Sequence, residues 1–401
     1  MFKFGSLFML YAAVFLTRIG FGLIIILFPL YLNVSNAILG IILGLYPALE
    51  AVSALPVGNY VDRRGRRRTF ILGLASISIL TLCIGLTRNT IIVGGAHALM
   101  GVSAALVTIA SLTMITDLTV VENRGTGMGA FDLANLGGYG VGAVLATFLE
   151  GILGAGELGL AFIFVAGILA SATGFIRVGL KEPAHIVSPR KTLRQNFERL
   201  GKDVHAILPI WFSLTIIVGF YFFLPKLVKD TRGQIAGSGG MVVLALVMLG
   251  AGAVLFGRLS DKIGRAKTML IGAAGELGFL LLFPLVFDKL LAVQGLQPTA
   301  IINIIGPLGV IAGILFFFGS ALIPSILAYI GDKAAHELRG SAMGLYSLML
   351  GTGIAIGNVL AGVLAEIGGV SAIFLVASII FAALGSVSGF LLRRQALPLV
   401  P

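Results

Sequence analysis

The chain has 401 residues, of which 58% are hydrophobic and only 11% are charged, and its formal net charge at pH 7 is +11. A water-soluble domain carries roughly 25% charged residues, so this composition excludes a soluble protein and predicts an integral membrane protein. The basic residues stand in short segments between apolar runs, which excludes a nucleic-acid-binding face. The single cysteine excludes an intrachain disulfide.

Twelve apolar runs are long enough to cross a bilayer, for which a helix needs about 20 residues. In chain order the predicted helices cover about 5–32, 37–61, 69–87, 91–116, 126–149, 158–177, 204–228, 236–257, 268–287, 299–330, 340–364 and 369–392. The first run lacks a cleavage-site pattern and is interpreted as a retained helix. The segment Gln294–Pro298 is expected in a loop before the tenth helix.

The distribution of lysine and arginine predicts the orientation. If both termini are cytoplasmic, the cytoplasmic segments hold 22 basic residues and the external loops hold five, while Arg18 lies inside a span. Because cytoplasmic loops are enriched in lysine and arginine, we expect a multi-pass protein of the plasma membrane with both termini in the cytoplasm.

An internal repeat divides the chain. At an offset of 199 residues, the sequence aligns Gly58, Asp62, Gly65 and Arg66 with Gly257, Asp261, Gly264 and Arg265. At an offset of 215, it aligns Asp117, Glu122, Arg124 and Gly142 with Asp332, Glu337, Arg339 and Gly357. The repeat predicts an all-α integral membrane fold of two six-helix bundles, 1–180 and 204–401, joined by a basic cytoplasmic linker, 181–203.

The repeated loops resemble the signature of the major facilitator superfamily, Gly-x-Leu-Ala/Ser-Asp-Arg/Lys-x-Gly-Arg/Lys, which follows the second and eighth spans of its members. The copy in Gly257–Arg265 matches throughout, whereas the first copy departs from the signature at Tyr60 and Val61. With the span count, the resemblance covers nearly the whole chain. It implies a monomeric secondary transporter that works by alternating access between its two halves.

The resemblance assigns two roles to the repeated loops. The residues at the 199 offset would form a conformational latch, in which the carboxylates of Asp62 and Asp261 bind a helix terminus of the other half and favour an outward-facing state. The alternative is that each carboxylate neutralises its own arginine-rich turn. The charged residues at the 215 offset would form a cytoplasmic loop network.

Ionisable side chains inside the spans are candidates for function, because each costs roughly 2.5–3.5 kcal/mol on insertion scales. We predict that Asp132, Glu50, Arg18 and His97 serve proton coupling, and that Asp132 is the carrier because no lysine or arginine shares its span, 126–149. The alternatives are a structural ion pair between Arg18 and Glu50 and a helix-packing role for His97. For Glu276, on a peripheral span, we expect a packing or lipid-interface role.

The resemblance also implies a substrate cavity. Its candidate lining residues are Tyr139, Tyr221, Tyr346 and Asn358. Aromatic residues on membrane helices also serve as packing groups or interface anchors, and this alternative applies to each of them.

The function predicted from these residues is secondary active transport of a small organic solute, coupled to protons. Export by antiport is preferred, because the glycine-rich stretch Gly137–Gly142 resembles the antiporter motif of the family, although the expected proline is absent. The alternatives are an uptake symporter or uncoupled facilitator of a sugar or organic-acid-like solute, and a membrane sensor without flux. Neither HExxH, GxSxG nor a P-loop occurs, so we expect no enzyme, metal or cofactor. The expected partners are the solute, H⁺ and the lipid bilayer, and no nucleic acid.

Overall fold

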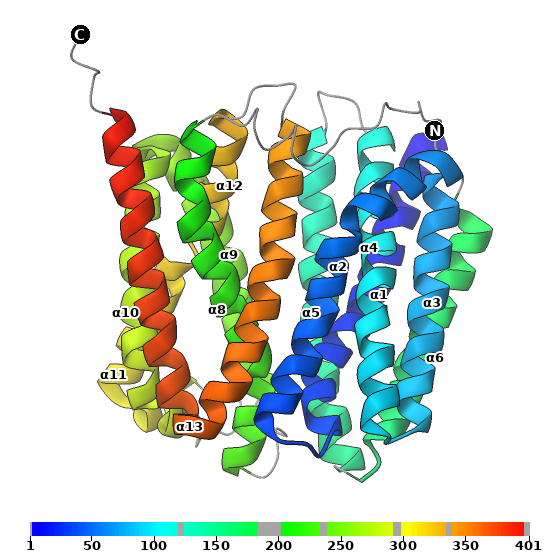
Figure 1. Cartoon of the computed structure of the whole chain (residues 1–401), viewed down its shortest axis with the longest axis horizontal. Helices are drawn as coiled ribbons and strands as arrows, with labels where there is room; N and C mark the ends of the chain where they lie inside the picture. The colour runs from blue at the N-terminus through cyan, green and yellow to red at the C-terminus, as the bar shows by residue number, and fades with distance from the viewer. Residues whose placement is uncertain are drawn as a thin grey trace. The chain divides into compact units, whose positions relative to one another are not determined.

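The computed structural model describes residues 2–118, 124–154, 156–180, 182, 202–232, 239–291, 298–333 and 339–396, and it is helical through these ranges apart from short turns. Eleven of the described helices are long and apolar enough to cross a membrane. The chain divides into two compact units, one formed by Met1–Arg190 with Leu224–Val242 and the other by Lys191–Phe223 with Val243–Pro401. Helices run side by side within each unit (Figure 1).

The first unit contains six helices that agree with the first six predicted spans. They are α1 (Phe2–Tyr31), α2 (Asn36–Arg64), α3 (Arg66–Leu86), α4 (Thr90–Leu118), α5 (Arg124–Leu153) and α6 (Leu158–Gly179). Helix α1 packs against α5 and α6, while α4 packs against α2 and α3. The C-terminal part of α8 (Lys202–Arg232), from Leu224 onwards, also belongs to this unit, where Lys229 Nζ lies 4.0 Å from a carboxylate oxygen of Glu150 on α5.

The second unit contains the remaining helices, apart from the end of α8 and the start of α9 that lie within Leu224–Val242 and belong to the first unit. They are α8 (Lys202–Arg232), α9 (Gly239–Ile263), α10 (Arg265–Leu291), α11 (Pro298–Gly319), α12 (Leu322–Lys333) and α13 (Arg339–Ala396). Two predicted boundaries differ. The span expected at 299–330 is kinked at Gly306 (φ 63°) and broken between α11 and α12, whereas the last two predicted spans form one element, bent at Gly368 and Gly369 (φ 58°). Glycine permits these positive φ values, and neither site shows in a hydropathy profile.

A close helix crossing built on two glycines occurs in each unit. In the first unit Gly22 of α1 faces Gly142 of α5, and a Cβ added at Gly22 would lie 2.5 Å from the carbonyl oxygen of Tyr139. In the second unit Gly219 of α8 faces Gly357 of α13, and a Cβ added at Gly219 would lie 2.5 Å from the carbonyl oxygen of Ile354. Small residues let membrane helices approach this closely. The crossings extend the repeat to the packing of the helices.

The repeat continues four residues along the same helices. Gly138 of α5 leaves no room for a side chain, because its Cβ would lie 2.6 Å from the Cβ of Arg18. The corresponding Gly353 of α13 faces Thr215 of α8 in the same way. Each crossing is therefore a small-xxx-small pair, and the residue opposite its first glycine is Arg18 in one unit and Thr215 in the other.

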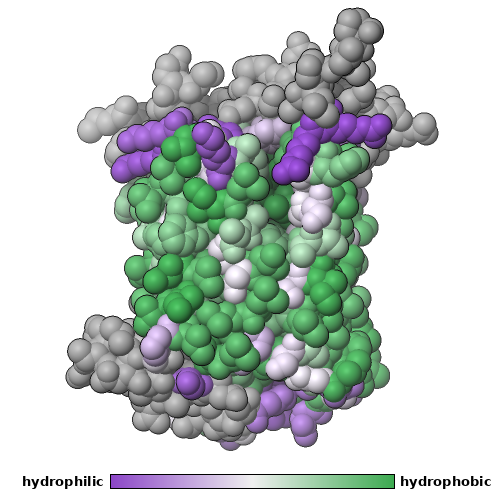
Figure 2. Space-filling view, turned by 90° about the vertical axis from the view of Figure 1, so that its left-hand side faces the viewer, coloured by the Kyte–Doolittle hydropathy of each residue, from purple (hydrophilic) through white to green (hydrophobic). Residues whose placement is uncertain are grey.

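Many large apolar side chains are exposed on the surface of the described helices. Figure 2 shows one face on which hydrophobic residues form a continuous band and hydrophilic residues gather towards the two ends. Large apolar side chains of the first unit, such as Val178 of α6 and Ile91 of α4, are also 91% and 85% exposed. A soluble protein seldom exposes such an area, so this surface is suited to contact lipid.

Candidate functional site

Two glycines at equivalent positions set the backbone of the repeated loops. Gly65 joins α2 to α3 and Gly264 joins α9 to α10, each with φ +95°. The hydroxyl of Thr69 donates to the carbonyl of Gly65 at 2.7 Å, and that of Thr268 donates to the carbonyl of Gly264 at 3.1 Å. An L side chain rarely adopts this φ. The two loops thus share one backbone conformation and one side-chain bond.

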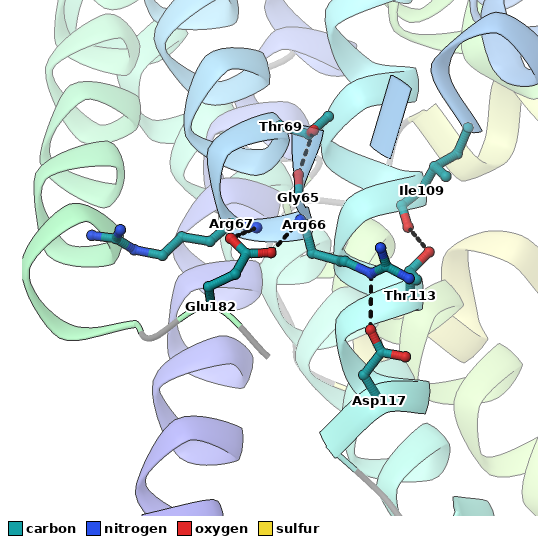
Figure 3. A network of polar contacts seen from close by, with 8 residues as sticks. All are labelled: Gly65, Arg66, Arg67, Thr69, Ile109, Thr113, Asp117 and Glu182. Atoms are coloured by element: carbon teal, nitrogen blue, oxygen red, sulfur yellow. Dashed lines mark hydrogen bonds and ion pairs between the residues drawn. The ribbon is translucent and has the colours of Figure 1, made fainter. Parts of the chain in front are cut away.

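Arg66, the first residue of α3, pairs with the end of α4. Its Nε donates to Oδ2 of Asp117 at 2.9 Å, and its side chain is 5% exposed (Figure 3). Arg66 was predicted in the latch and Asp117 in the separate loop network, yet the structure joins them in one cluster. This charge-assisted bond holds the start of α3 against the end of α4, and loss of Asp117, which is 22% exposed, would leave the buried charge of Arg66 without this partner.

Glu182 completes this cluster. Its Oε1 accepts the backbone N–H of Arg66 at 2.6 Å and its Oε2 accepts that of Arg67 at 3.0 Å, so one carboxylate binds two unpaired N–H groups at the start of α3 (Figure 3). The guanidinium of Arg67 donates in turn to the carbonyl of Arg177 at the end of α6. Glu182 lies in the segment predicted as the linker, 181–203. The sequence signal that could have indicated its contact with Arg66 and Arg67 is an acidic residue directly after a predicted span, on the same side as an arginine-rich loop.

Replacing Glu182 with alanine should destabilise the first unit by about 1 kcal/mol, since the start of α3 would lose a capping carboxylate. Thermal unfolding of the purified protein in detergent would measure this as a lower melting temperature. Glu157→Ala is the matched control, because Glu157 precedes α6 but its side chain makes no capping bond. Equal melting temperatures for the two variants would contradict the capping role.

The other latch residues are placed as follows. A Cβ added at Gly58 would meet no described atom within 4 Å, and one at Gly257 would meet only the Cβ of Pro324 at 3.9 Å. Asp261 is exposed and forms an ion pair with Arg265 of its own loop. This contact is the one expected if the carboxylate neutralises its own arginine-rich turn. Glu122 and Glu337 lie outside the described residues, as do the side chains of Asp62, Arg124, Asp332 and Arg339.

Arg18 is held between α1 and α5 inside the first unit. Its Nε donates to Oδ1 of Asn135 at 2.6 Å and its NH1 donates to the hydroxyl of Tyr139 at 3.0 Å. The Asn135 amide donates to the carbonyl of Phe131, which turns its oxygen towards Arg18. The guanidinium also lies 5.2 Å from the ring centroids of both Phe21 and Tyr139. Hydrogen bonds and ring faces together thus fix this cation within the helices.

Glu50 and His97 lie on neighbouring helices of the same unit. Glu50 is half-buried where Gly101 brings α4 against α2, and Arg18 interacts with it electrostatically without forming an ion pair in the described structure. His97 is 6% exposed, stacks on Phe28 with ring centroids 3.9 Å apart, and places Nδ1 3.2 Å from the carbonyl oxygen of Ile42. These contacts of His97 are the ones expected if it serves helix packing, which was the alternative to its predicted role in proton coupling.

The second unit contains a buried carboxyl. Glu276 of α10 is 5% exposed, and the hydroxyl of Tyr221 on α8 donates to its Oε1 at 3.1 Å. Gly319 leaves the room that this carboxyl occupies, because a Cβ there would lie 2.6 Å from its Oε2. The lipid-interface alternative for Glu276 is therefore wrong. The sequence could not pair Glu276 with Tyr221, because hydropathy gives the depth of a residue and not the side of the helix on which it lies.

Of the remaining residues predicted to line the cavity, the structure describes the side chain of Asn358 but not that of Tyr346. Asn358 is 1% exposed at the crossing of α8 and α13, where its amide donates to the carbonyl of Ile354 at 3.1 Å. Its side-chain oxygen has no hydrogen-bond partner among the described residues. The side chains of Tyr346 and of Asp132 lie outside the described part of the chain.

Comparison with known proteins agrees with this architecture. The family model for the Major Facilitator Superfamily matches residues 10–316 and 230–399. Multidrug resistance protein 2 of Bacillus subtilis is 23% identical over 371 residues, which cover 88% of this chain and 87% of that protein. The Gentisate transporter of Corynebacterium glutamicum is 26% identical over 355 residues, which cover 83% and 74%.

A solved structure shares the fold. It is a bacterial homolog of the human lysosomal transporter Spinster in an inward-facing and unoccupied conformation, and it aligns with a TM-score of 0.71 and 16% identity over 98% of this chain and 97% of its own. Since the family model spans nearly the whole sequence, the chain belongs to the Major Facilitator Superfamily of transporters.

Proposed function

We propose that this protein exports a small organic solute in exchange for protons, by alternating access between two six-helix bundles whose termini face the cytoplasm. The observation that carries the proposal is the fixed cation of Arg18, which Asn135 and Tyr139 hold inside membrane-spanning helices. A charge at this depth is costly to insert and marks a functional position. Glu50 lies within electrostatic reach of it, so the first unit concentrates ionisable groups where a proton path requires them.

Asp132 is our proposed proton carrier. It lies on α5 three residues before Asn135 and seven before Tyr139, a spacing that places all three positions along one side of the helix. A proton bound at this position can therefore act on the residues that hold Arg18. Opening of the cavity to cytoplasmic water would release the proton and link its movement to the alternation of the two halves.

The direction of transport is supported by the relatives. Several relatives at 22–25% identity are named multidrug resistance proteins, among them the Bacillus subtilis protein above. The aromatic residues Phe21 and Tyr139 beside Arg18 suit a flat, partly apolar solute.

Uptake of an organic acid is the second candidate. The guanidinium of Arg18 is the kind of group that binds a carboxylate in two places, and one relative is named as a Gentisate transporter. Flux of a lipophilic cation and of an aromatic carboxylate, measured in parallel on the same proteoliposomes, separates the two candidates.

Asp132→Asn should abolish accumulation of the solute driven by a pH gradient, while exchange of the solute down its own gradient continues. The amide keeps the shape of the side chain but cannot bind and release a proton. Proteoliposome flux with and without a pH gradient measures both rates, and Glu157→Gln, outside the spans, is the control. A variant that still accumulates solute with the normal dependence on the pH gradient would exclude Asp132 as the carrier.

A further inference from the structure

A shallow apolar groove lies on the outer surface of the first unit, between α2, α3 and α4. Its volume is about 320 Å³, and its walls include Pro56 and Tyr60 of α2, Leu72 of α3, and Val102 and Leu106 of α4. Tyr60 and Leu72 are 40% and 44% exposed, so the groove opens towards the surroundings of the helices. Leu72, Val102 and Leu106 lie within candidate membrane-spanning segments of α3 and α4, so this wall of the groove is at a depth that lipid chains occupy.

Arginines stand at one end of this groove. Arg64 follows Tyr60 by four residues on α2, and Arg68 precedes Leu72 by four residues on α3, so each arginine shares a helix face with a wall residue. Each lies about one helical turn, roughly 5.4 Å, beyond the apolar wall. Because Gly65 joins the two helices, both arginines lie at the same end of the groove.

These arginines differ from their neighbours in the same loop. Arg66 is buried on Asp117, and Arg67 binds the carbonyl of Arg177. Arg63, Arg64 and Arg68 are exposed. The acidic residue of this stretch is Asp62, so residues 61–68 carry five basic side chains and one acidic side chain. The loop therefore presents positive charge to the membrane surface directly beside an apolar groove.

We propose that the groove is a binding site for an anionic phospholipid. The phosphate binds Arg64 and Arg68, with Arg63 adding charge, and an acyl chain lies against Tyr60, Leu72 and Val102. Guanidinium groups bind phosphate oxygens in pairs, and basic clusters at the end of a membrane helix favour anionic over zwitterionic headgroups. The site therefore fits a molecule that has both a negatively charged headgroup, for the arginines, and a hydrocarbon chain, for the apolar groove. It stands independently of the transport proposal.

Native mass spectrometry of the full chain, titrated with phosphatidylglycerol and with phosphatidylcholine of the same acyl chains, tests the site. We expect phosphatidylglycerol to bind at least tenfold more tightly, and the double variant Arg64→Ala, Arg68→Ala to lose that preference. The matched control is Arg393→Ala, Arg394→Ala, which removes two exposed arginines from the end of α13 and should keep the preference. Loss of the preference in both double variants would show a response to net charge alone and overturn the site.

Two further arms test the groove itself. Leu72→Trp fills the groove while keeping every arginine, and it should weaken binding of phosphatidylglycerol at least threefold. Glycerol 3-phosphate, which has the headgroup chemistry without the chains, should not displace the lipid. Unchanged lipid binding in Leu72→Trp, or displacement by glycerol 3-phosphate, would show that the groove takes no part. Equal affinity for the two lipids would overturn the selectivity for anionic lipid.

Discussion

Gly142→Val should prevent the first unit from reaching its native packing. A Cβ at this position would meet the carbonyl oxygen of Ile19 and would lie 3.0 Å from the Cα of Gly22. These are backbone atoms and cannot rotate away as the end of a flexible side chain can. Overpacking of a well-packed site typically costs about 1–3 kcal/mol, and here α1 and α5 must separate along their crossing. We expect the variant to lose most of its monodisperse yield and to melt well below the unaltered protein.

The matched control for this variant is Gly167→Val on α6. A Cβ added at Gly167 meets no described atom within 4 Å, so this variant adds the same isopropyl group at a position where its Cβ has room. Gly357→Val should repeat the effect of Gly142→Val in the second unit, because its Cβ would meet the carbonyl oxygen of Ile216. Size-exclusion profiles and melting curves in detergent compare all three. If Gly142→Val behaves as Gly167→Val does, the crossing does not limit stability.

Arg18→Lys should reduce transport at least tenfold, equivalent to about 1.4 kcal/mol in the transition state. A lysine ammonium is a point charge without the planar fork that reaches Asn135 and Tyr139 together, and it stacks less well on the rings of Phe21 and Tyr139. Arg18→Ala should be at least as inactive. Tyr139→Phe should have the smaller effect, since it removes one hydrogen bond and keeps the ring.

The folded state should tolerate these changes. Arg18→Lys keeps the charge and Tyr139→Phe keeps the ring, while Arg18→Ala removes a membrane-embedded charge whose insertion cost of roughly 2.5–3.5 kcal/mol offsets the lost contacts. Melting temperatures near that of the unaltered protein would then assign the defect to transport. Arg177→Ala, an exposed arginine at the end of α6, is the control and should transport normally. Normal flux in Arg18→Lys would show that the guanidinium is not needed.

The sequence predicted those features that depend on hydrophobic length and on repetition. The first six spans agree with α1 to α6, and the aligned loops at Gly65 and Gly264 have the same φ of +95°. Features that depend on the rotation of one helix against another could not be predicted. The contact of Arg18 with Asn135 rather than Glu50 belongs to this class, as does that of Glu276 with Tyr221.

Glu182 illustrates a second limit. A residue directly after a span reads as the start of a linker, and only the folded arrangement places its carboxylate against the start of α3, 115 and 116 residues away in sequence. The bend of α13 at Gly369 is a third case, because a glycine in an apolar run is equally compatible with a straight helix and a kink.

The paired glycine crossings have an evolutionary consequence. Duplication of an ancestral six-helix gene would copy the crossing, so that Gly22 and Gly142 correspond to Gly219 and Gly357. Selection would remove a substitution at any of the four glycines, because no side chain fits there. The position one turn earlier escapes that constraint, and it carries Arg18 in one copy and Thr215 in the other. Divergence could therefore change the chemistry of one half without disturbing its backbone. Among descendants of this gene, the four glycines should persist while the residues at 18 and 215 vary with the cargo.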